Sequence, residues 1–126
     1  MSRKKVLLVD DAKTVLMMEQ MILSRPEFQL FTASCGEAAL ELAAAERPDL
    51  ILLDLVMPDM TGIEVLERLR ADPATKATPI IMVTTRSEQP YVEKAHAAGC
   101  TDYVTKPFDG AQLLVKVRNL LGLTDE

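Results

Sequence analysis

Residues 50–62 read LILLDLVMPDMTG, and this stretch decides the fold of the chain. Its first four residues are apolar, which is typical of a strand buried on both faces of a sheet, whereas the proline and glycine further along indicate a loop. Asp54 stands where the strand gives way to the loop. Because open α/β sheets bind ligands outside the carboxyl ends of their strands, we predict that Asp54 lies at a binding site.

Three further apolar runs end on polar side chains in the same way. The polar residues that follow these runs are Asp10, Asp11, Thr84 and Lys106. Helical patterns lie between the runs, and this alternation of strands and helices indicates parallel β-α-β units. Since the carboxyl ends of parallel strands meet at one edge of a sheet, these four residues and Asp54 are predicted to form one polar site.

The helical segments have recognisable starts and stops. We predict helices from near Ala12 to before Pro26, from Ser34 or Gly36 to Glu46, from Gly62 to before Pro73, from Ser87 to Gly99, and from Asp109 to Leu121. Ser87 is the predicted cap of the fourth helix, with Pro90 tolerated in its first turn. Residues 28–33 are amphipathic, which favours a strand at an edge of the sheet.

The inward face of the first helix is predicted from its spacing. Val15, Met18 and Ile22 recur at helical intervals and are expected to point to the core. The methionines of this helix, Met17 and Met21 among them, are expected to pack in the core or at its boundary. A pliable docking surface is the alternative for these side chains.

Size and composition indicate an ordinary soluble domain. The 126 residues are 48% apolar and 26% charged, without a repeat or linker, so one domain over residues 1–126 with no separate output domain is expected. No apolar run approaches the ~20 residues of a membrane span, and residues 1–5 lead directly into a strand, so we expect a cytoplasmic protein without membrane contact. The net charge of −5 argues against direct binding of nucleic acid.

The two cysteines and the single histidine are not expected to do chemistry. Cys35 and Cys100 are too few for a disulfide framework or a zinc site. His96 lies in the middle of a predicted helix without a carboxylate partner nearby in the sequence, so a catalytic role is not expected.

Taken together, the motifs at the ends of the strands resemble the receiver domain of two-component response regulators. They are Asp10-Asp11, Asp54 followed by Met57-Pro58 and Gly62, Thr84, and Tyr103-Val104-Thr105-Lys106-Pro107-Phe108. Each motif is common alone, but all of them in this order, over nearly the whole chain, form a specific signal. The resemblance, which is to single-domain, chemotaxis-regulator-like receivers, implies a doubly wound, flavodoxin-like α/β fold. In that fold a five-stranded parallel sheet in the order 2-1-3-4-5 is flanked by five helices.

This implied order places four of the polar strand ends side by side. Four neighbouring strands at a spacing of ~4.8 Å span about 14 Å, which long side chains and the twist of the sheet can bridge. By the same spacing Cys35 and Cys100 fall roughly 19 Å apart, beyond the ~7 Å limit for a disulfide. No bridge between them is therefore expected.

Three carboxylates at neighbouring strand ends repel one another. At about 5 Å and an effective dielectric constant of about 20, each pair costs on the order of 3 kcal/mol, so a cation is expected. Mg²⁺ suits such oxygen ligands, and Mn²⁺ is an alternative. The resemblance implies that Asp11 and Asp54 bind the metal directly, that Asp10 holds a metal-bound water, and that the backbone carbonyl of Val56 completes the set. Spacing alone does not separate Asp10 from Asp11.

The resemblance also assigns roles in phosphorylation. It implies that Asp54 is the phosphoacceptor, that its donor is a histidine kinase or phosphotransfer domain, and that Thr84 and Lys106 contact phosphoryl oxygens. Pro107 is a candidate for a cis peptide bond, which would aim Lys106 inward. The simpler interpretations are a capping pair for Asp10 and Asp11, a loop or cap carboxylate for Asp54, a strand-end residue for Thr84 and a surface side chain for Lys106.

A switch is implied as well. In the resembled family, phosphorylation draws Thr84 inward and admits Tyr103, which alters a protein-binding surface on the fourth helix, fifth strand and fifth helix. Tyr103 as a plain edge residue is the alternative. Val56 and Arg86 stand where such proteins tune dephosphorylation. The protein target is unknown, and dimerisation on phosphorylation is left open.

Other functions compete with this one. A phosphohydrolase of the haloacid dehalogenase type also uses a strand-end aspartate, but it needs a second aspartate where Val56 stands. Flavodoxin-like cofactor binding is disfavoured, because the loop after Asp10 is acidic and lacks glycine. A receiver excised from a larger regulator and a phosphate sink or interaction-only module stay open. We expect no enzyme beyond self-phosphorylation from small donors and autodephosphorylation.

Overall fold

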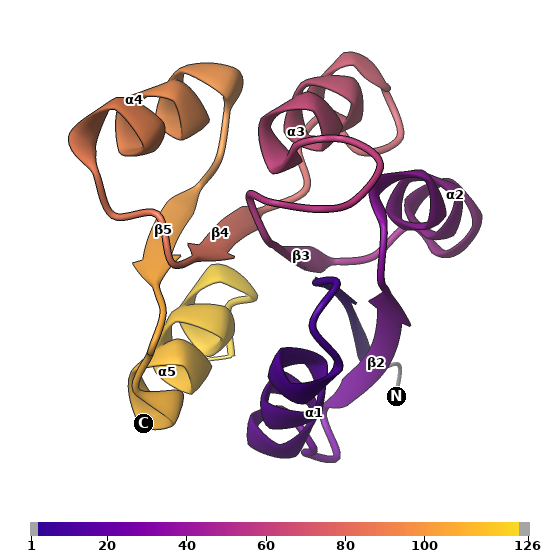
Figure 1. Cartoon of the computed structure of the whole chain (residues 1–126). Coiled ribbons are helices and arrows are strands. Elements are labelled where there is room, and N and C mark those ends of the chain that lie inside the picture. Colours follow the sequence, from indigo (N-terminus) through magenta and orange to yellow (C-terminus); the bar gives the residue numbers. More distant parts are fainter. Residues whose placement is uncertain (1–2, 124–126) are drawn as a thin grey trace.

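The computed structural model describes residues 3–123, which form a parallel sheet with helices on both faces (Figure 1). The five strands are β1 (Lys4–Val9), β2 (Phe28–Ala33), β3 (Leu50–Leu53), β4 (Ile80–Thr84) and β5 (Asp102–Thr105). Their order is β2-β1-β3-β4-β5, and every neighbouring pair is parallel. The predicted fold class and strand order are thus confirmed. Residues 1–2 and 124–126 of the predicted domain lie outside the described residues.

Residues 3–123 contain five helices, of which four connect successive strands and the last follows β5. They are α1 (Lys13–Ile22), α2 (Gly36–Glu46), α3 (Gly62–Ala71), α4 (Gln89–Ala98) and α5 (Gly110–Leu120). Figure 1 shows α1 and α5 on one face of the sheet and α2, α3 and α4 on the other. Within residues 3–123, no helix combines the length and apolar character that crossing a membrane requires.

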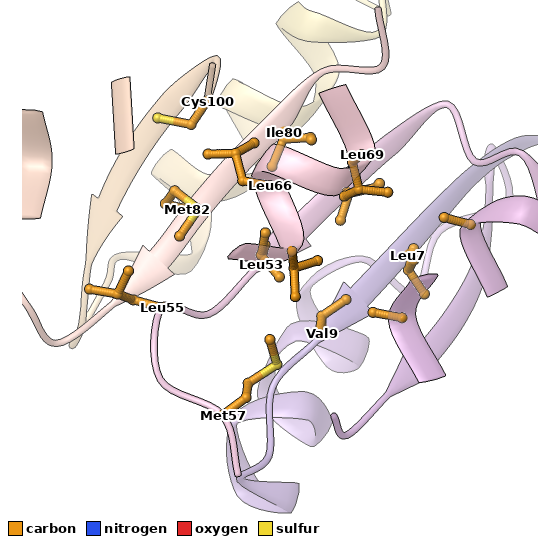
Figure 2. Packing of buried hydrophobic residues seen from close by; sticks show 14 of the residues in the cluster. Leu7, Val9, Leu53, Leu55, Met57, Leu66, Leu69, Ile80, Met82 and Cys100 are labelled. Atoms are coloured by element: carbon orange, nitrogen blue, oxygen red, sulfur yellow. The ribbon is translucent and has the colours of Figure 1, made fainter. Parts of the chain in front are cut away.

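The central strands supply side chains to both faces. Leu8 and Leu52 join the cluster beneath α1 and α5, whereas Leu7 and Leu53 join the cluster beneath α2, α3 and α4, part of which Figure 2 shows. All four are at most 1% exposed. A strand that is buried on both faces needs an unbroken apolar run, which is why β3 reads Leu-Ile-Leu-Leu. β2 lies at an edge, as predicted, and exposes Gln29 and Thr32.

The inward face of α1 agrees with the predicted one only in part. Leu16 and Glu19 are the buried residues of this helix, whereas Met18 is 49% exposed. Met17 and Met21 are 60% and 76% exposed, so the expectation that the methionines pack in the core or at its boundary is wrong for these two side chains. Of the predicted residues, Ile22 does pack against the cluster beneath α1 and α5, and Val15 is half-buried. The Met-rich sequence offers several apolar stripes, and packing against α5 and β1 selects among them.

The predicted start of α4 is also corrected. Glu88, not Ser87, is the N-cap residue, and no side chain caps this end of the helix. With Ser87 as the cap, Pro90 would occupy the third helical position, where a capping side chain takes a backbone N–H that proline lacks. The other end agrees with the prediction, because Gly99 follows the helix with φ 108°.

Cys35 and Cys100 are both free, as expected. His96 is exposed on α4, with its Nδ1 3.7 Å from the Cys100 sulfur.

Candidate functional site

The predicted site residues lie at the carboxyl ends of β1, β3, β4 and β5. Hydrogen bonds of the sheet continue one residue beyond the strands and place these residues. The Asp54 N–H donates to the Val9 carbonyl at 3.0 Å, and the Lys106 N–H donates to the Thr84 carbonyl at 2.8 Å. These backbone hydrogen bonds of the sheet therefore fix the positions of Asp54 and Lys106, independently of their side chains.

Three carboxylates meet at this edge. Asp10, Asp11 and Asp54 each offer an oxygen, and these atoms lie within 4.8 Å of one another. Asp10 is 1% and Asp54 7% exposed, whereas Asp11 is exposed to solvent. This separation of the carboxylate oxygens agrees with the distance of about 5 Å that was assumed for the repulsion between them. Three hard oxygen donors, one of them open to solvent, form a set that fits Mg²⁺.

Lys106 reaches into the acidic cluster. Its Nζ lies 2.7 Å from Asp10 Oδ2 and 3.8 Å from Asp54 Oδ2, and the Lys106–Pro107 peptide bond, the candidate for a cis bond, is cis. At an effective dielectric constant of about 20, unit charges 3.8 Å apart attract by about 4 kcal/mol, which is comparable with the repulsion between two of the carboxylates. Lys106 thus offsets part of the repulsion.

The Asp54 carboxylate is held in one orientation. Its Oδ1 accepts a hydrogen bond from the Leu55 N–H at 2.8 Å, and its Oδ2 faces Lys106. Burial raises the pKa of Asp54, and the Asp10 carboxylate raises it further, while Lys106 and the Leu55 N–H act in the opposite direction. Asp54 is therefore a more basic carboxylate than one in water.

Asp10 combines a local and a long-range role. Its Oδ1 accepts the Ala12 N–H at 2.9 Å and so shapes the turn that leads into α1, while its Oδ2 binds Lys106. The N-cap of α1 is Ala12, so neither aspartate of the pair caps that helix directly. Asp10 therefore both shapes the turn before α1 and contributes to the acidic cluster.

The loop after Asp54 is tightly folded. The Gly62 N–H donates to the Leu55 carbonyl at 2.6 Å, and a Cβ at Gly62 would come within 2.2 Å of the Asp54 carbonyl oxygen, so only glycine fits there. Met57 is buried, whereas Val56 is 51% exposed at the mouth of the site. The loop thus presents Val56 beside Asp54.

Thr84 and Tyr103 are linked through the backbone of Arg86. The Thr84 Oγ1 is buried and accepts the Arg86 N–H at 3.3 Å, and the Tyr103 hydroxyl donates to the Arg86 carbonyl. The Tyr103 ring is half-buried and packs against the cluster beneath α2, α3 and α4. The Arg86 guanidinium lies 5.5 Å from the centre of the Tyr91 ring. The side chains of Thr84 and Tyr103 therefore both bind the backbone of Arg86, one at its N–H and the other at its carbonyl.

Glu19 is a residue that the sequence reasoning missed. It is 1% exposed on α1, and its Oε1 has no hydrogen-bond partner among residues 3–123. Burial first, and then the charge of Asp10, raise the pKa of Glu19 to about 8; Asp54 acts in the same direction and Lys106 against it. The signal was present, because Glu19 follows Leu16 at the spacing of an inward stripe.

The chain is similar to known proteins over nearly its whole length. The model of a family described as response regulator receiver domain matches residues 6–118. The chain is 38% identical over 118 residues to the alkaline phosphatase synthesis transcriptional regulatory protein PhoP of Bacillus subtilis, covering 94% of this chain and 48% of that protein. It is also 38% identical over 120 residues to the transcriptional regulatory protein SrrA of Staphylococcus aureus, covering 95% and 48%.

The chain therefore spans about half the length of these curated relatives. Among solved structures, the chemotaxis response regulator CheY4 of Vibrio cholerae superposes with a TM-score of 0.88 at 34% identity, covering 94% of this chain and 99% of that one.

Proposed function

This chain belongs to the response regulator receiver domain family, and from that premise we propose that Asp54 accepts a phosphoryl group from a histidine kinase or phosphotransfer domain. The observation that carries the proposal is the cluster of Asp10, Asp11 and Asp54 within 4.8 Å, into which Lys106 projects. A purely structural salt bridge would need only one carboxylate for Lys106, whereas three carboxylates lie here. The surplus of negative charge favours a site that receives a divalent cation and an anion together.

The donor set fits Mg²⁺, with Mn²⁺ as an alternative. Asp11 and Asp54 would bind the ion directly, Asp10 through a water molecule, and Val56 through its backbone carbonyl. When bound, the ion neutralises negative charge on the transferring phosphoryl group. Asp11 is suited to capture the ion from solvent, because it is the exposed member of the cluster.

Asp54 supplies the nucleophile. A carboxylate oxygen attacks phosphorus, a new oxygen–phosphorus bond forms, and the phosphorus–nitrogen bond of the donor phosphohistidine breaks. The electron pair of that bond stays on the imidazole nitrogen. The Leu55 N–H on Oδ1 holds the plane of the carboxylate during attack, so little reorientation is needed.

Lys106 and Thr84 hold the product. The Lys106 ammonium, 3.8 Å from Asp54 Oδ2, is placed to contact a phosphoryl oxygen on that side. The Thr84 oxygen already accepts the Arg86 N–H, so its own proton is free to donate to another phosphoryl oxygen.

The switch follows from that new hydrogen bond. If Thr84 moves toward the phosphoryl group, its bond to the Arg86 N–H changes, and the Arg86 carbonyl that holds the Tyr103 hydroxyl changes with it. This transmits phosphorylation to the surface of α4, β5 and α5, where an unidentified protein target binds. Val56 and Arg86, at the mouth of the site, are proposed to tune the access of water to the phosphoryl group.

The proposal is tested by weighing the intact protein after incubation with Mg²⁺ and acetyl phosphate. The wild type should gain the mass of one phosphoryl group, and Asp54→Asn should gain none. Asp11→Asn keeps the acceptor but loses a metal ligand, so it should be labelled slowly. Labelling of Asp54→Asn would move the acceptor elsewhere, and an unlabelled wild type would contradict the proposed function.

A further inference from the structure

The loop that presents Val56 is attached to the first turn of α2. Asp59 binds the N-terminus of this helix with both carboxylate oxygens. Oδ1 accepts the Gly36 N–H at 2.8 Å, and Oδ2 accepts the Glu37 N–H at 2.9 Å. Both bonds join residues more than 20 positions apart in the sequence. The β3–α3 loop and the start of α2 are therefore one connected unit.

Met60 adds a second attachment at the same place. A Cβ on Gly36 would come within 2.3 Å of the Met60 Cγ and 3.0 Å of a Val65 methyl group, so the Met60 side chain lies directly against the glycine backbone. Any larger residue at position 36 would force the Met60 side chain to shift. The polar contact of Asp59 and the apolar contact of Met60 thus meet on one helical turn.

The first turn of α2 has no cap of its own. Its N-cap residue is Cys35, whose side chain makes no capping hydrogen bond. The first N–H groups of a helix have no partner within the helix, and a cap residue with a side-chain oxygen usually supplies one. Asp59 does this from another loop, and these hydrogen bonds to Glu37 and Gly36 lower the pKa of its carboxyl group.

The attachment lies on the far side of the residue proposed to bind the metal. The segment from Asp54 to Asp59 is held at its start by the sheet and the Leu55 N–H, in its middle by the buried Met57, and at its end by Asp59. Val56 lies between these points and is exposed. The Gly62 N–H also holds the Leu55 carbonyl, next to Val56. The direction of the Val56 carbonyl therefore depends on these attachments together, and Asp59 is the one that ties the loop to another helix.

We propose that Asp59 is a positioning residue for the metal site: by capping α2 from the β3–α3 loop, it holds the Val56 carbonyl in the orientation that Mg²⁺ binding requires. This inference rests on the proposed function, because it assumes that Val56 contributes to the ion. Partners that orient metal ligands without touching the metal typically account for 10- to 100-fold in affinity. Since Asp59 acts on one ligand, a loss of roughly tenfold is expected when it is removed.

The experiment measures Mg²⁺ affinity by titration calorimetry and thermal unfolding without metal, on the full chain. Asp59→Ala should weaken Mg²⁺ binding about tenfold and lower the unfolding temperature. Asp59→Asn, which keeps one acceptor oxygen, should lie between Asp59→Ala and the wild type and serves if the alanine variant folds poorly. Glu37→Gln removes an exposed charge at the same turn and leaves both hydrogen bonds, so it measures the effect of charge alone and should bind Mg²⁺ nearly as the wild type does.

A second substitution separates the effect of Asp59 on Mg²⁺ affinity from its effect on thermal stability. Cys35→Ser gives α2 a cap of its own, so the double variant with Asp59→Ala should regain thermal stability. It should not regain Mg²⁺ affinity, because the loop remains detached.

Wild-type affinity in Asp59→Ala, or recovery of affinity in the double variant, overturns the positioning role. So does an equal loss in Glu37→Gln. A wild type that binds no Mg²⁺ overturns the proposed function instead, and the two failures are thus distinguished.

Discussion

Replacing Glu19 by glutamine tests the electrostatics beneath the site. The side chain is 1% exposed, and burial together with Asp10 raises its pKa from 4.5 to about 8. In the unfolded chain Glu19 ionises near its ordinary value, whereas in the folded protein it stays protonated up to about pH 8. The unfolded state therefore binds fewer protons in this interval, and stability falls as the pH rises through it.

The size of the effect follows from the width of that interval. Each pH unit within it costs about 1.4 kcal/mol of stability, so the contribution of Glu19 between pH 5 and pH 7 is a loss of about 2 to 3 kcal/mol. Glutamine has nearly the same shape and cannot ionise. In Glu19→Gln this part of the pH dependence should vanish. The raised pKa of Asp54 acts in the same direction but is present in both proteins, so the difference between them isolates Glu19.

The assay is urea unfolding at pH 5, 6, 7 and 8 in the presence of a chelator. The wild type should lose stability across the series relative to Glu19→Gln. Glu67→Gln, a change of an exposed side chain on α3, should follow the wild-type curve and controls for net charge. Parallel curves for the wild type and Glu19→Gln would refute the reasoning, because they would mean that the buried carboxyl group has a partner that stabilises its charge.

Three further outcomes are expected. Asp54→Asn should raise the metal-free unfolding temperature by a few degrees, since burial and Asp10 disfavour the charge of Asp54 more than Lys106 favours it; a clear fall in calorimetry would contradict this balance. Lys106→Ala should cost about 3 kcal/mol in urea unfolding without metal, because it leaves buried carboxylates unpaired, and added Mg²⁺ should stabilise this variant more than the wild type. A variant as stable as the wild type would rule out that role. Met21→Ser should change stability by less than about 0.5 kcal/mol, because the side chain is 76% exposed. If α1 is the kinase-docking surface, the variant should slow labelling by a phosphohistidine donor but not by acetyl phosphate; equal rates with the donor would exclude Met21 from that surface.

Much of the fold could be predicted from local patterns. Strands that are buried on both faces, such as β3, must be apolar throughout, and polar residues can appear only where the strand leaves the sheet. Asp54 and Thr84 are therefore recognisable as strand-end residues from the sequence alone. The strand order came from the resemblance to a family, since a pattern of strands and helices does not by itself rank the strands in space.

Other features depended on the packed molecule. The Met-rich first helix offers several apolar stripes, so its sequence could not decide that Leu16 and Glu19 face inward. Lys106 binds Asp10, which lies 96 positions earlier in the sequence. Asp59 caps α2 at Gly36, which lies 23 positions earlier. Composition and periodicity reflect only the local requirements of a helix or strand along the chain. The partner of a charge or of an uncapped helix is set by distances through space, which exist only once the sheet and its helices have packed.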